Sequence, residues 1–153
     1  MNIFLATDHA GFELKNIVKE HLIQNTEHTI VDCGARHFDA DDDYPDFIAE
    51  AAKRVSAEPH TTRAIIFGGS GQGEAMLANR FKNVRAVAYY HHDLKIIELS
   101  RQHNDANILS IGARFVSAEN ALEAITQWLS TTPAADQKYQ RRVKKAERLS
   151  SGQ

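Results

Sequence analysis

A glycine-rich segment that ends in a carboxylate is the part of this sequence best suited to chemistry. Four of the eight glycines fall within Gly68-Gly69-Ser70-Gly71-Gln72-Gly73-Glu74, between an apolar run at 64–67 and a helix-like run at 75–79. A strand that leads through such a turn into a helix points backbone N–H groups at one place, where they favour an anion. An enzyme that takes a proton from carbon needs a base beside donors that stabilise the resulting oxyanion. Glu74 and the loop before it could supply both.

Other uses of this loop stay open on the residues alone. No Gly-Lys-Ser or Gly-Lys-Thr follows it, which excludes a P-loop, and its third glycine is misplaced for a dinucleotide fingerprint. The loop also follows the third expected strand and not the first. The glycines could instead allow tight packing of a helix on a strand. Glu74 could simply favour the dipole of the helix that it begins.

Two further polar segments lie next to expected strands and could supply an acid or bind an anion. Asp8 and His9 directly follow the first apolar run, and a histidine can contact phosphate or transfer protons near neutral pH. The segment Ser100-Arg101-Gln102-His103-Asn104-Asp105-Ala106-Asn107 precedes the last expected strand. A turn accounts for the middle of this segment but not for His103 and Asn107 as well. Asp8, in turn, could merely start the next helix.

Two other polar clusters are not assigned to a site. One loop carries four aspartates, Asp39, Asp41, Asp42 and Asp43. It lacks the glycine and the terminal glutamate of an EF-hand, so we predict a solvated acidic loop. His91 and His92 are adjacent in a loop, which is weak evidence for a metal site, and we predict instead that a helix starts at Asp93.

Short β-rich runs alternate with amphipathic helical runs along the chain. We expect strands at 3–7, 29–32, 64–67, 84–89 and 107–111, and helices at 11–24, 44–57, 73–81, 93–102, 117–129 and 134–149. This order predicts an α/β fold: a single-domain, Rossmann-like three-layer sandwich with a five-stranded parallel sheet, helices on both faces and an extra C-terminal helix. Ligand-binding loops in such a sheet follow the carboxyl ends of the strands. Asp8, His9 and the glycine loop should therefore share one edge.

Composition narrows the function classes. The chain has 153 residues, enough for one domain with a real core, and its formal net charge is −2. This balance provides no basic field for nucleic acid or a membrane surface. The first residues turn acidic too early for a signal peptide and no apolar stretch reaches the length of a membrane span, so we expect a cytoplasmic protein. Cys33 is the only cysteine, which excludes a disulfide framework within the chain and a cysteine-rich zinc site.

Taken together, these segments resemble the ribose-5-phosphate isomerase B family, which also includes galactose-6-phosphate and allose-6-phosphate isomerases. The resemblance runs from Asn2 to about Arg148. It is carried by Asp8-His9-Ala10-Gly11-Phe12, Asp43-Tyr44-Pro45, the glycine loop with Ala78-Asn79, Val84-Arg85-Ala86, the 100–107 segment with Gly112-Ala113-Arg114, and Gln140-Arg141-Arg142-Val143.

The resemblance implies an aldose–ketose isomerase that interconverts ribose 5-phosphate and ribulose 5-phosphate, in the pentose phosphate pathway, with no metal and no other cofactor. Many relatives place a catalytic cysteine where this sequence has Gly68. This sequence looks like the branch that carries a glutamate at the end of the loop, and the implied base is Glu74. His103, working with Asp8, is the implied acid that opens the sugar ring. Ser70 and the loop backbone would stabilise the enediolate.

The remaining roles that the resemblance implies concern binding. The substrate would be held by His9, Tyr44, Gly69, Gly71, Gln72, Gly73 and Asn104. The phosphate would be held by His9, Arg114, Lys138 and Arg142. Lys138 stands where the nearest branch tends to have arginine, and Tyr139 where histidine is usual. A lysine keeps the charge but loses the bidentate fork of arginine.

The family builds its site at a dimer interface, with the His103 segment supplied by the neighbouring subunit. The resemblance therefore implies a homodimer with shared active sites, or a tetramer, and one sugar-phosphate isomerase domain over residues 1–153 whose helix at about 134–149 reaches the partner. From the residues alone, that basic helix could also pack across its own chain. Another sugar phosphate of four or six carbons, such as galactose or allose 6-phosphate, stays open as the substrate. A phosphate-binding module without catalysis is the third interpretation, but a passive anion site would not collect acids such as Glu74 and Asp8.

Overall fold

Five parallel strands form the centre of the structure, a computed structural model that describes residues 1–150. The strands are β1 (Asn2–Thr7), β2 (Thr29–Asp32), β3 (Thr62–Gly68), β4 (Ala86–Tyr89) and β5 (Ile108–Gly112), in the order β2-β1-β3-β5-β4. In the register of the central strands, Thr7 lies opposite Phe67, which lies opposite Ile111. The predicted five-stranded parallel sheet is confirmed.

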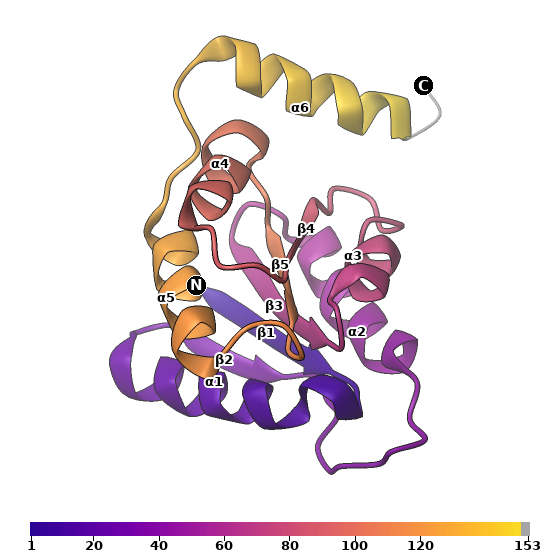
Figure 1. Cartoon of the computed structure of the whole chain (residues 1–153). Helices are drawn as coiled ribbons and strands as arrows, with labels where there is room; N and C mark the ends of the chain where they lie inside the picture. The colour runs from indigo at the N-terminus through magenta and orange to yellow at the C-terminus, as the bar shows by residue number, and fades with distance from the viewer. Residues whose placement is uncertain (151–153) are drawn as a thin grey trace.

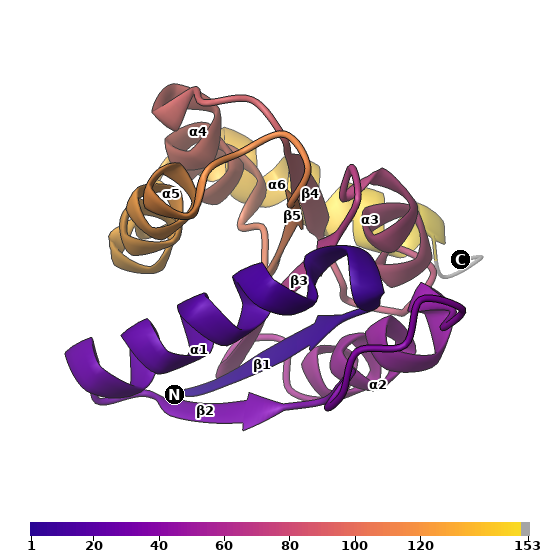
Figure 2. The same cartoon turned by 60° about the horizontal axis from the view of Figure 1, so that its bottom comes forward.

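Helices cover both faces of this sheet, as Figure 1 and Figure 2 show. One face packs against α1 (Phe12–Asn25), α4 (Leu94–Asn104) and α5 (Ala118–Ser130), and the other against α2 (Tyr44–Ala57) and α3 (Gln72–Ala78). Along β1, Ile3 and Leu5 join the first core, whereas Phe4 and Ala6 join the second. This alternation follows from the strand itself, whose successive side chains point to opposite faces. The three-layer sandwich is therefore as predicted.

The carboxyl ends of the strands gather the loops that follow them. β1 ends at Thr7 and β3 at Gly68, so Asp8 and the glycine loop begin at the same edge of the sheet. A short 3₁₀ helix, η1 (His9–Gly11), follows β1 before α1 begins. Asp8 does start this helix, as one interpretation of the sequence held, because its Oδ1 accepts the Ala10 N–H at 2.9 Å.

The end of α4 lies at the opposite edge. This helix leads back from the carboxyl end of β4 and finishes at Asn104, just before β5 begins. The residues that follow pair with the starts of strands: the Asn107 carbonyl accepts the Ala64 N–H at 3.1 Å, near the beginning of β3. His103 and Asn104 are thus placed at the amino edge of the sheet, away from the glycine loop.

The buried Asn107 side chain explains why β4 starts later than the predicted residue 84. Its Oδ1 accepts the Arg85 N–H at 2.8 Å, and its Nδ2 donates to the Asn83 carbonyl at 2.8 Å. Together with the Asn107 N–H, which donates to the Arg85 carbonyl at 3.1 Å, these bonds hold residues 83–85 beside the start of β5. Asn107, which a turn could not explain, therefore has a structural role.

Helix α6 (Gln137–Ser150) lies apart from the sandwich, above the end of α4 (Figure 1). None of its residues is buried. A backbone hydrogen bond from Ala134 to the Gln102 carbonyl, 3.0 Å long, and an ion pair between Arg85 and Glu147 tie this region to the rest of the chain. The predicted C-terminal helix is confirmed, with its start at Gln137. Among residues 1–150, no helix has both the length and the apolar character that crossing a membrane requires.

Candidate active site

Glu74 is the centre of a first group of predicted site residues, at the carboxyl edge of the sheet. Glu74 is 5% exposed and Asp8 is 7% exposed, so both carboxylates are taken out of water. A Cβ built on Gly68 would overlap the Glu74 carboxylate. The space at the end of β3 therefore has room for one functional group, and in this chain Glu74 occupies it from the first turn of α3.

Gly71 gives the glycine loop its shape. Its φ of 74° lies in the left-handed region that favours glycine, and the residue directly precedes α3. The Ser110 hydroxyl of β5 donates a hydrogen bond to the Gly71 carbonyl, which ties the loop to the sheet. Ser70 is half-buried beside it, and its Oγ accepts the Gln72 N–H at 3.3 Å. The loop is thus held in one conformation next to Glu74.

Tyr44 and Arg114 lie against this loop. A Cβ built on Gly73 would be 3.2 Å from the Tyr44 hydroxyl oxygen, and one on Gly69 would be 3.5 Å from Arg114 Nη1. The Arg114 N–H also donates to the Gly69 carbonyl at 3.1 Å. The structure therefore brings these two predicted binding residues, which lie far apart in the sequence, against the glycine loop that leads to the predicted base.

Burial gives Glu74 the character of a base. Loss of water raises the pKa of the Glu74 carboxyl above its usual range, and the negative charge of nearby Asp8 acts in the same direction. A carboxylate with a raised pKa holds an abstracted proton more firmly than an exposed one. Glu74 is therefore better suited to removing a proton from carbon than an ordinary surface glutamate is.

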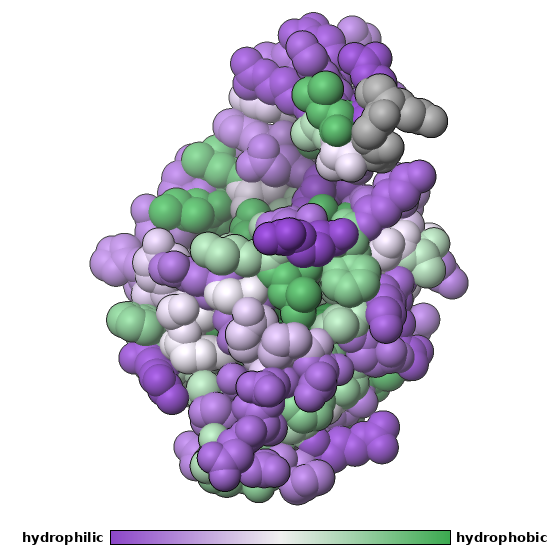
Figure 3. All heavy atoms as spheres, turned by 90° about the vertical axis from the view of Figure 1, so that its right-hand side faces the viewer, coloured by the Kyte–Doolittle hydropathy of each residue, from purple (hydrophilic) through white to green (hydrophobic). Residues whose placement is uncertain are grey.

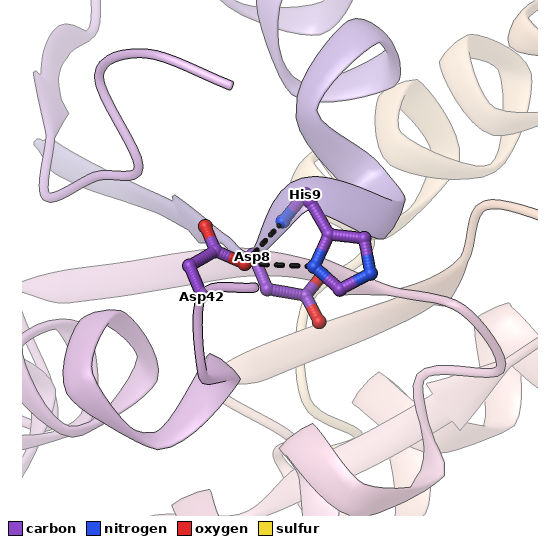
Figure 4. Close-up of side chains that lie close together, drawn as sticks. All are labelled: Asp8, His9 and Asp42. Carbon is purple, nitrogen blue, oxygen red and sulfur yellow. Dashed lines mark hydrogen bonds and ion pairs between the residues drawn. The ribbon is translucent and has the colours of Figure 1, made fainter. Parts of the chain in front are cut away.

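Asp42 clamps His9 at the same edge of the sheet (Figure 4). Its Oδ1 accepts the His9 backbone N–H at 2.9 Å and lies 2.8 Å from His9 Nδ1. The Asp42 side chain is only 9% exposed. The predicted solvated acidic loop is therefore correct for Asp39, Asp41 and Asp43, which are exposed, but wrong for Asp42. The cause is a contact with a residue 33 positions earlier, which the composition of the loop does not reveal.

Asp8, His9 and Asp42 also approach the spacing of metal ligands, since one ligand atom from each lies within 4.8 Å of the others. Each of the three side chains already takes part in a hydrogen bond, however. Nδ1 of His9 bonds Asp42, and Asp8 Oδ1 accepts a backbone N–H. We therefore assign this cluster to hydrogen bonding.

A second group of predicted site residues lies at the amino edge. The His103 ring stacks on Tyr139 of α6, with ring centroids 4.0 Å apart. Lys138 Nζ and Arg142 Cζ lie 4.7 Å and 6.0 Å from the centroid of the same tyrosine ring. Asn104 and Arg142 together line a hollow of about 400 Å³. Within one chain, the structure thus gathers these predicted residues with one another, but not with the glycine loop.

The sequence model of the Ribose/Galactose Isomerase family matches residues 3–146. The chain belongs to this family. Among curated relatives, ribose-5-phosphate isomerase B of Mycobacterium tuberculosis is 40% identical over 143 residues, which are 94% of this chain and 86% of the relative. The probable ribose-5-phosphate isomerase B of Mycoplasma genitalium is 37% identical over 144 residues, 94% of this chain and 92% of the relative.

Solved structures of such isomerases superimpose on nearly the whole chain. Ribose-5-phosphate isomerase B from Mycoplasma genitalium with bound ribulose-5-phosphate is 35% identical, with a TM-score of 0.92 over 99% of this chain and 97% of its own. The type B enzyme from Trypanosoma cruzi is 28% identical, with a TM-score of 0.90 over 100% of both chains. The resemblance to this family is confirmed, and so is the fold.

The comparison with the ribose/galactose isomerase family bears on why residue 68 is a glycine in this chain. The sequence resemblance places the cysteine of other branches at this position, and here the Glu74 carboxylate fills the space that any side chain at residue 68 would need. A side chain at residue 68 and the Glu74 carboxylate in its present position therefore cannot occupy this space together. The single cysteine of the chain, Cys33, follows β2 instead, where burial raises the pKa of its thiol to about 11.

Proposed function

We propose that this protein is an aldose–ketose isomerase that interconverts ribose 5-phosphate and ribulose 5-phosphate without a metal or other cofactor, as a step of pentose phosphate metabolism. The observation that carries the proposal is the buried Glu74 carboxylate, seated beside Gly68 at the glycine loop and close to Asp8. The ribulose-5-phosphate bound to the Mycoplasma genitalium relative supports this choice of substrate.

The proposed chemistry needs one base and one acid. His103, working with Asp8, gives a proton to the ring oxygen, and the same pair takes the proton of the C1 hydroxyl. The bond from C1 to the ring oxygen breaks, and the open-chain aldehyde forms. Glu74 then takes the proton from C2, a C1–C2 double bond forms, and the carbonyl electrons move onto O1. Ser70 and the loop N–H groups stabilise this oxyanion. A proton then passes from O2 to O1, a carbonyl forms at C2, and Glu74 returns its proton to C1. One base suffices because the two carbons are adjacent on one face of a cis-enediolate.

A panel of phosphorylated sugars tests this function directly. Ribose 5-phosphate, allose 6-phosphate, galactose 6-phosphate and a four-carbon aldose phosphate are assayed for ketose formation in the presence of EDTA. We expect the highest kcat/KM with ribose 5-phosphate. A clear preference for another sugar would reassign the substrate within the family. Binding of inorganic phosphate with no turnover of any sugar would instead favour a phosphate-binding module.

We further propose that two chains complete each site, in a homodimer whose α6 helix reaches the partner. The support is the separation, within one chain, of His103 at the amino edge from Glu74 at the carboxyl edge. Helix α6 buries no residue, and Met76, Ile96 and Phe115 expose 65%, 53% and 64% of their surface. Figure 3 shows apolar side chains in the middle of one face, below the hydrophilic atoms at its top. A tetramer and a cytoplasmic location remain predictions.

Mixing two inactive variants tests the two-chain site. Glu74→Gln and His103→Ala proteins are each expected to be nearly inactive. A mixed dimer would hold one site with both native residues and one site with neither. After random exchange, the mixture should therefore recover about one quarter of the wild-type activity. Mass spectrometry confirms that subunits have exchanged. Exchanged mixtures that stay inactive would mean that one chain supplies both residues.

The phosphate site is proposed to combine His9 and Arg114 from one chain with Lys138 and Arg142 from the other. Arg142→Ala is expected to lower kcat/KM for ribose 5-phosphate by ~10–100-fold, because a hydrogen bond to a charged group contributes roughly 1.5–3 kcal/mol. Turnover of unphosphorylated ribose, slow as it will be, should change far less. An equal loss of activity toward both sugars would show that Arg142 does not bind the phosphate.

Cys33→Ser is expected to leave catalysis unchanged. The residue lies after β2 and is half-buried, and its raised pKa keeps the thiol protonated at neutral pH. The measurements are kcat/KM for ribose 5-phosphate and the exchange of the C2 proton with solvent, with and without a thiol-alkylating reagent. If the serine variant lost C2 proton exchange, Cys33 and not Glu74 would be the candidate base.

A further inference from the structure

We propose that Asp42 is a positioning residue for phosphate binding, which holds the His9 imidazole so that its Nε2–H is presented to the substrate phosphate. This inference rests on the proposed function, in which His9 is a phosphate ligand. The family resemblance assigns no role to Asp42.

The geometry at Asp42 fixes both the backbone and the ring of His9. One carboxylate oxygen, Oδ1, accepts the His9 backbone N–H at 2.9 Å and lies 2.8 Å from Nδ1. The second oxygen, Oδ2, is buried and has no hydrogen-bond partner within the described chain. The Asp42 side chain is 9% exposed, against 28% for His9. In Figure 4 the other ring nitrogen of His9 points away from Asp42. The aspartate is therefore withdrawn from water while the far side of the imidazole stays accessible.

The chemistry of the pair determines what that accessible nitrogen can do. A carboxylate only accepts hydrogen bonds, so Nδ1 must carry the proton that it shares with Asp42. A neutral ring would then present a bare lone pair at Nε2, which repels a phosphate oxygen. Only the cation presents an N–H there. The hydrogen bond to Asp42 is the main cause that raises the pKa of His9, helped by the charges of Asp8 and Asp42 and opposed by burial and by Arg114.

The loop that carries Asp42 also packs beside the ring. Phe38 meets the His9 ring edge-on, with centroids 6.3 Å apart, and it meets Phe12 in the same manner at 6.3 Å. The segment between β2 and α2 therefore contacts His9 through an aromatic side chain as well as through a carboxylate. These contacts restrict the rotation of the imidazole, which lowers the entropy lost when phosphate binds.

The direction in which phosphate affinity changes when Asp42 is neutralised distinguishes this positioning role from simple charge repulsion. A carboxylate near a phosphate site repels the phosphate, so neutralising it should strengthen binding if only Coulomb forces act. If Asp42 acts through His9, neutralising it should weaken binding instead, because the imidazole loses its proton at a lower pH. One substitution therefore gives opposite results under the two accounts.

The test compares Asp42→Asn with Asp41→Asn in the full chain. Asp41 is the exposed neighbour, and its replacement removes the same charge. For Asp42→Asn we expect the Kd of inorganic phosphate and the KM of ribose 5-phosphate to rise about tenfold near pH 7.5, with kcat changed much less. The difference from wild type should shrink toward pH 5.5, where the imidazole is charged in both proteins. Asp41→Asn should bind phosphate as wild type does or slightly more tightly.

Two further readouts tie the effect to His9. Nuclear magnetic resonance of labelled histidine should show a lower His9 pKa in Asp42→Asn than in wild type, and an Nδ1–H tautomer in the wild-type neutral ring. In a His9→Asn background, adding Asp42→Asn should cause no further loss of phosphate affinity. The positioning role is overturned if the second substitution weakens binding equally in both backgrounds, if the loss is the same at every pH, or if Asp42→Asn tightens phosphate binding.

The failure of this proposal is distinguishable from failure of the proposed function. The titration of His9 and the binding of inorganic phosphate are both measured without sugar. A wild-type protein that turned over no ribose 5-phosphate would defeat the proposed function, while these two measurements would still decide the role of Asp42. An active wild-type enzyme whose Asp42→Asn variant bound phosphate normally at pH 7.5 would defeat the positioning role alone.

Discussion

Glu74→Gln is expected to lower the kcat for ribose 5-phosphate by at least ~10²–10⁴-fold, because it removes the proposed general base while keeping the size of the side chain. The exchange of the substrate C2 proton with solvent should fall by a similar factor. Binding of inorganic phosphate should persist, since His9 and Arg114 are untouched. Turnover close to that of wild type would remove Glu74 from the mechanism.

The same variant also tests how the buried Glu74 carboxylate affects the stability of the fold. Burial raises the folded-state pKa of Glu74 above its ordinary value of 4.5, so the folded protein binds this proton more tightly than the unfolded chain does. Ionisation of Glu74 therefore lowers the stability as the pH rises from about 4.5 through the raised pKa. At pH 7, Glu74→Gln should be at least as stable as wild type, and the difference should shrink in acid. Thermal unfolding at pH 4.5 and pH 7 checks this. A variant markedly less stable than wild type at pH 7 would show that the carboxylate supports the fold.

Gly68→Ala is expected to lower kcat by ~10²-fold or more, although it adds a single methyl group. That methyl group would overlap the Glu74 carboxylate, which must then move out of its place at the glycine loop. Misplacing a reacting group by about 1 Å can cost a factor of about 10² in rate. Circular dichroism and inorganic phosphate binding serve as controls for the fold. Near-normal turnover of Gly68→Ala would show that the position of the Glu74 carboxylate is not critical.

A double substitution at residues 68 and 74 tests the Gly68 prediction in a second way. The double variant Gly68→Cys with Glu74→Ala places a thiol in the space that the carboxylate has left. We expect it to be more active than Glu74→Ala alone, and we expect thiol alkylation to abolish that activity. If the double variant were no more active than Glu74→Ala, a thiol placed in the space beside β3 would not be enough to replace the proposed base.

The layout of the fold was predictable because periodicity records which face of each element is buried. All five strands occur where alternating and apolar runs indicate them, and β2 and α2 have the predicted bounds. The start of β4 was not predictable, since a side chain 22 residues later, Asn107, takes over the backbone N–H of Arg85. The pattern of apolar residues along a short stretch of sequence indicates which side chains are buried. A hydrogen bond between residues that are distant in the sequence depends on the complete fold and cannot be predicted from such a pattern.

The candidate site was predictable to the same extent. Glu74, Asp8 and His9 belong to loops that a parallel sheet must bring to one edge, so their proximity follows from the order of the elements. Asp42 was missed because it shares its loop with three other aspartates, and only one of the four turns inward to His9. No property of residue type or spacing distinguishes that aspartate from Asp41 beside it.

Helix α6 packs no side chain into the interior of its own chain. Isolated helices of this length are marginal in water, so most of the stability of such a helix comes from packing. If a second copy supplies that packing, subunit association and the ordering of Lys138 and Arg142 become one equilibrium. Dilution would then act like an inhibitor, because it would separate two proposed phosphate ligands, Lys138 and Arg142, from the proposed base without altering a single residue. Catalytic capacity per chain would thus depend on how much of the protein the cell makes.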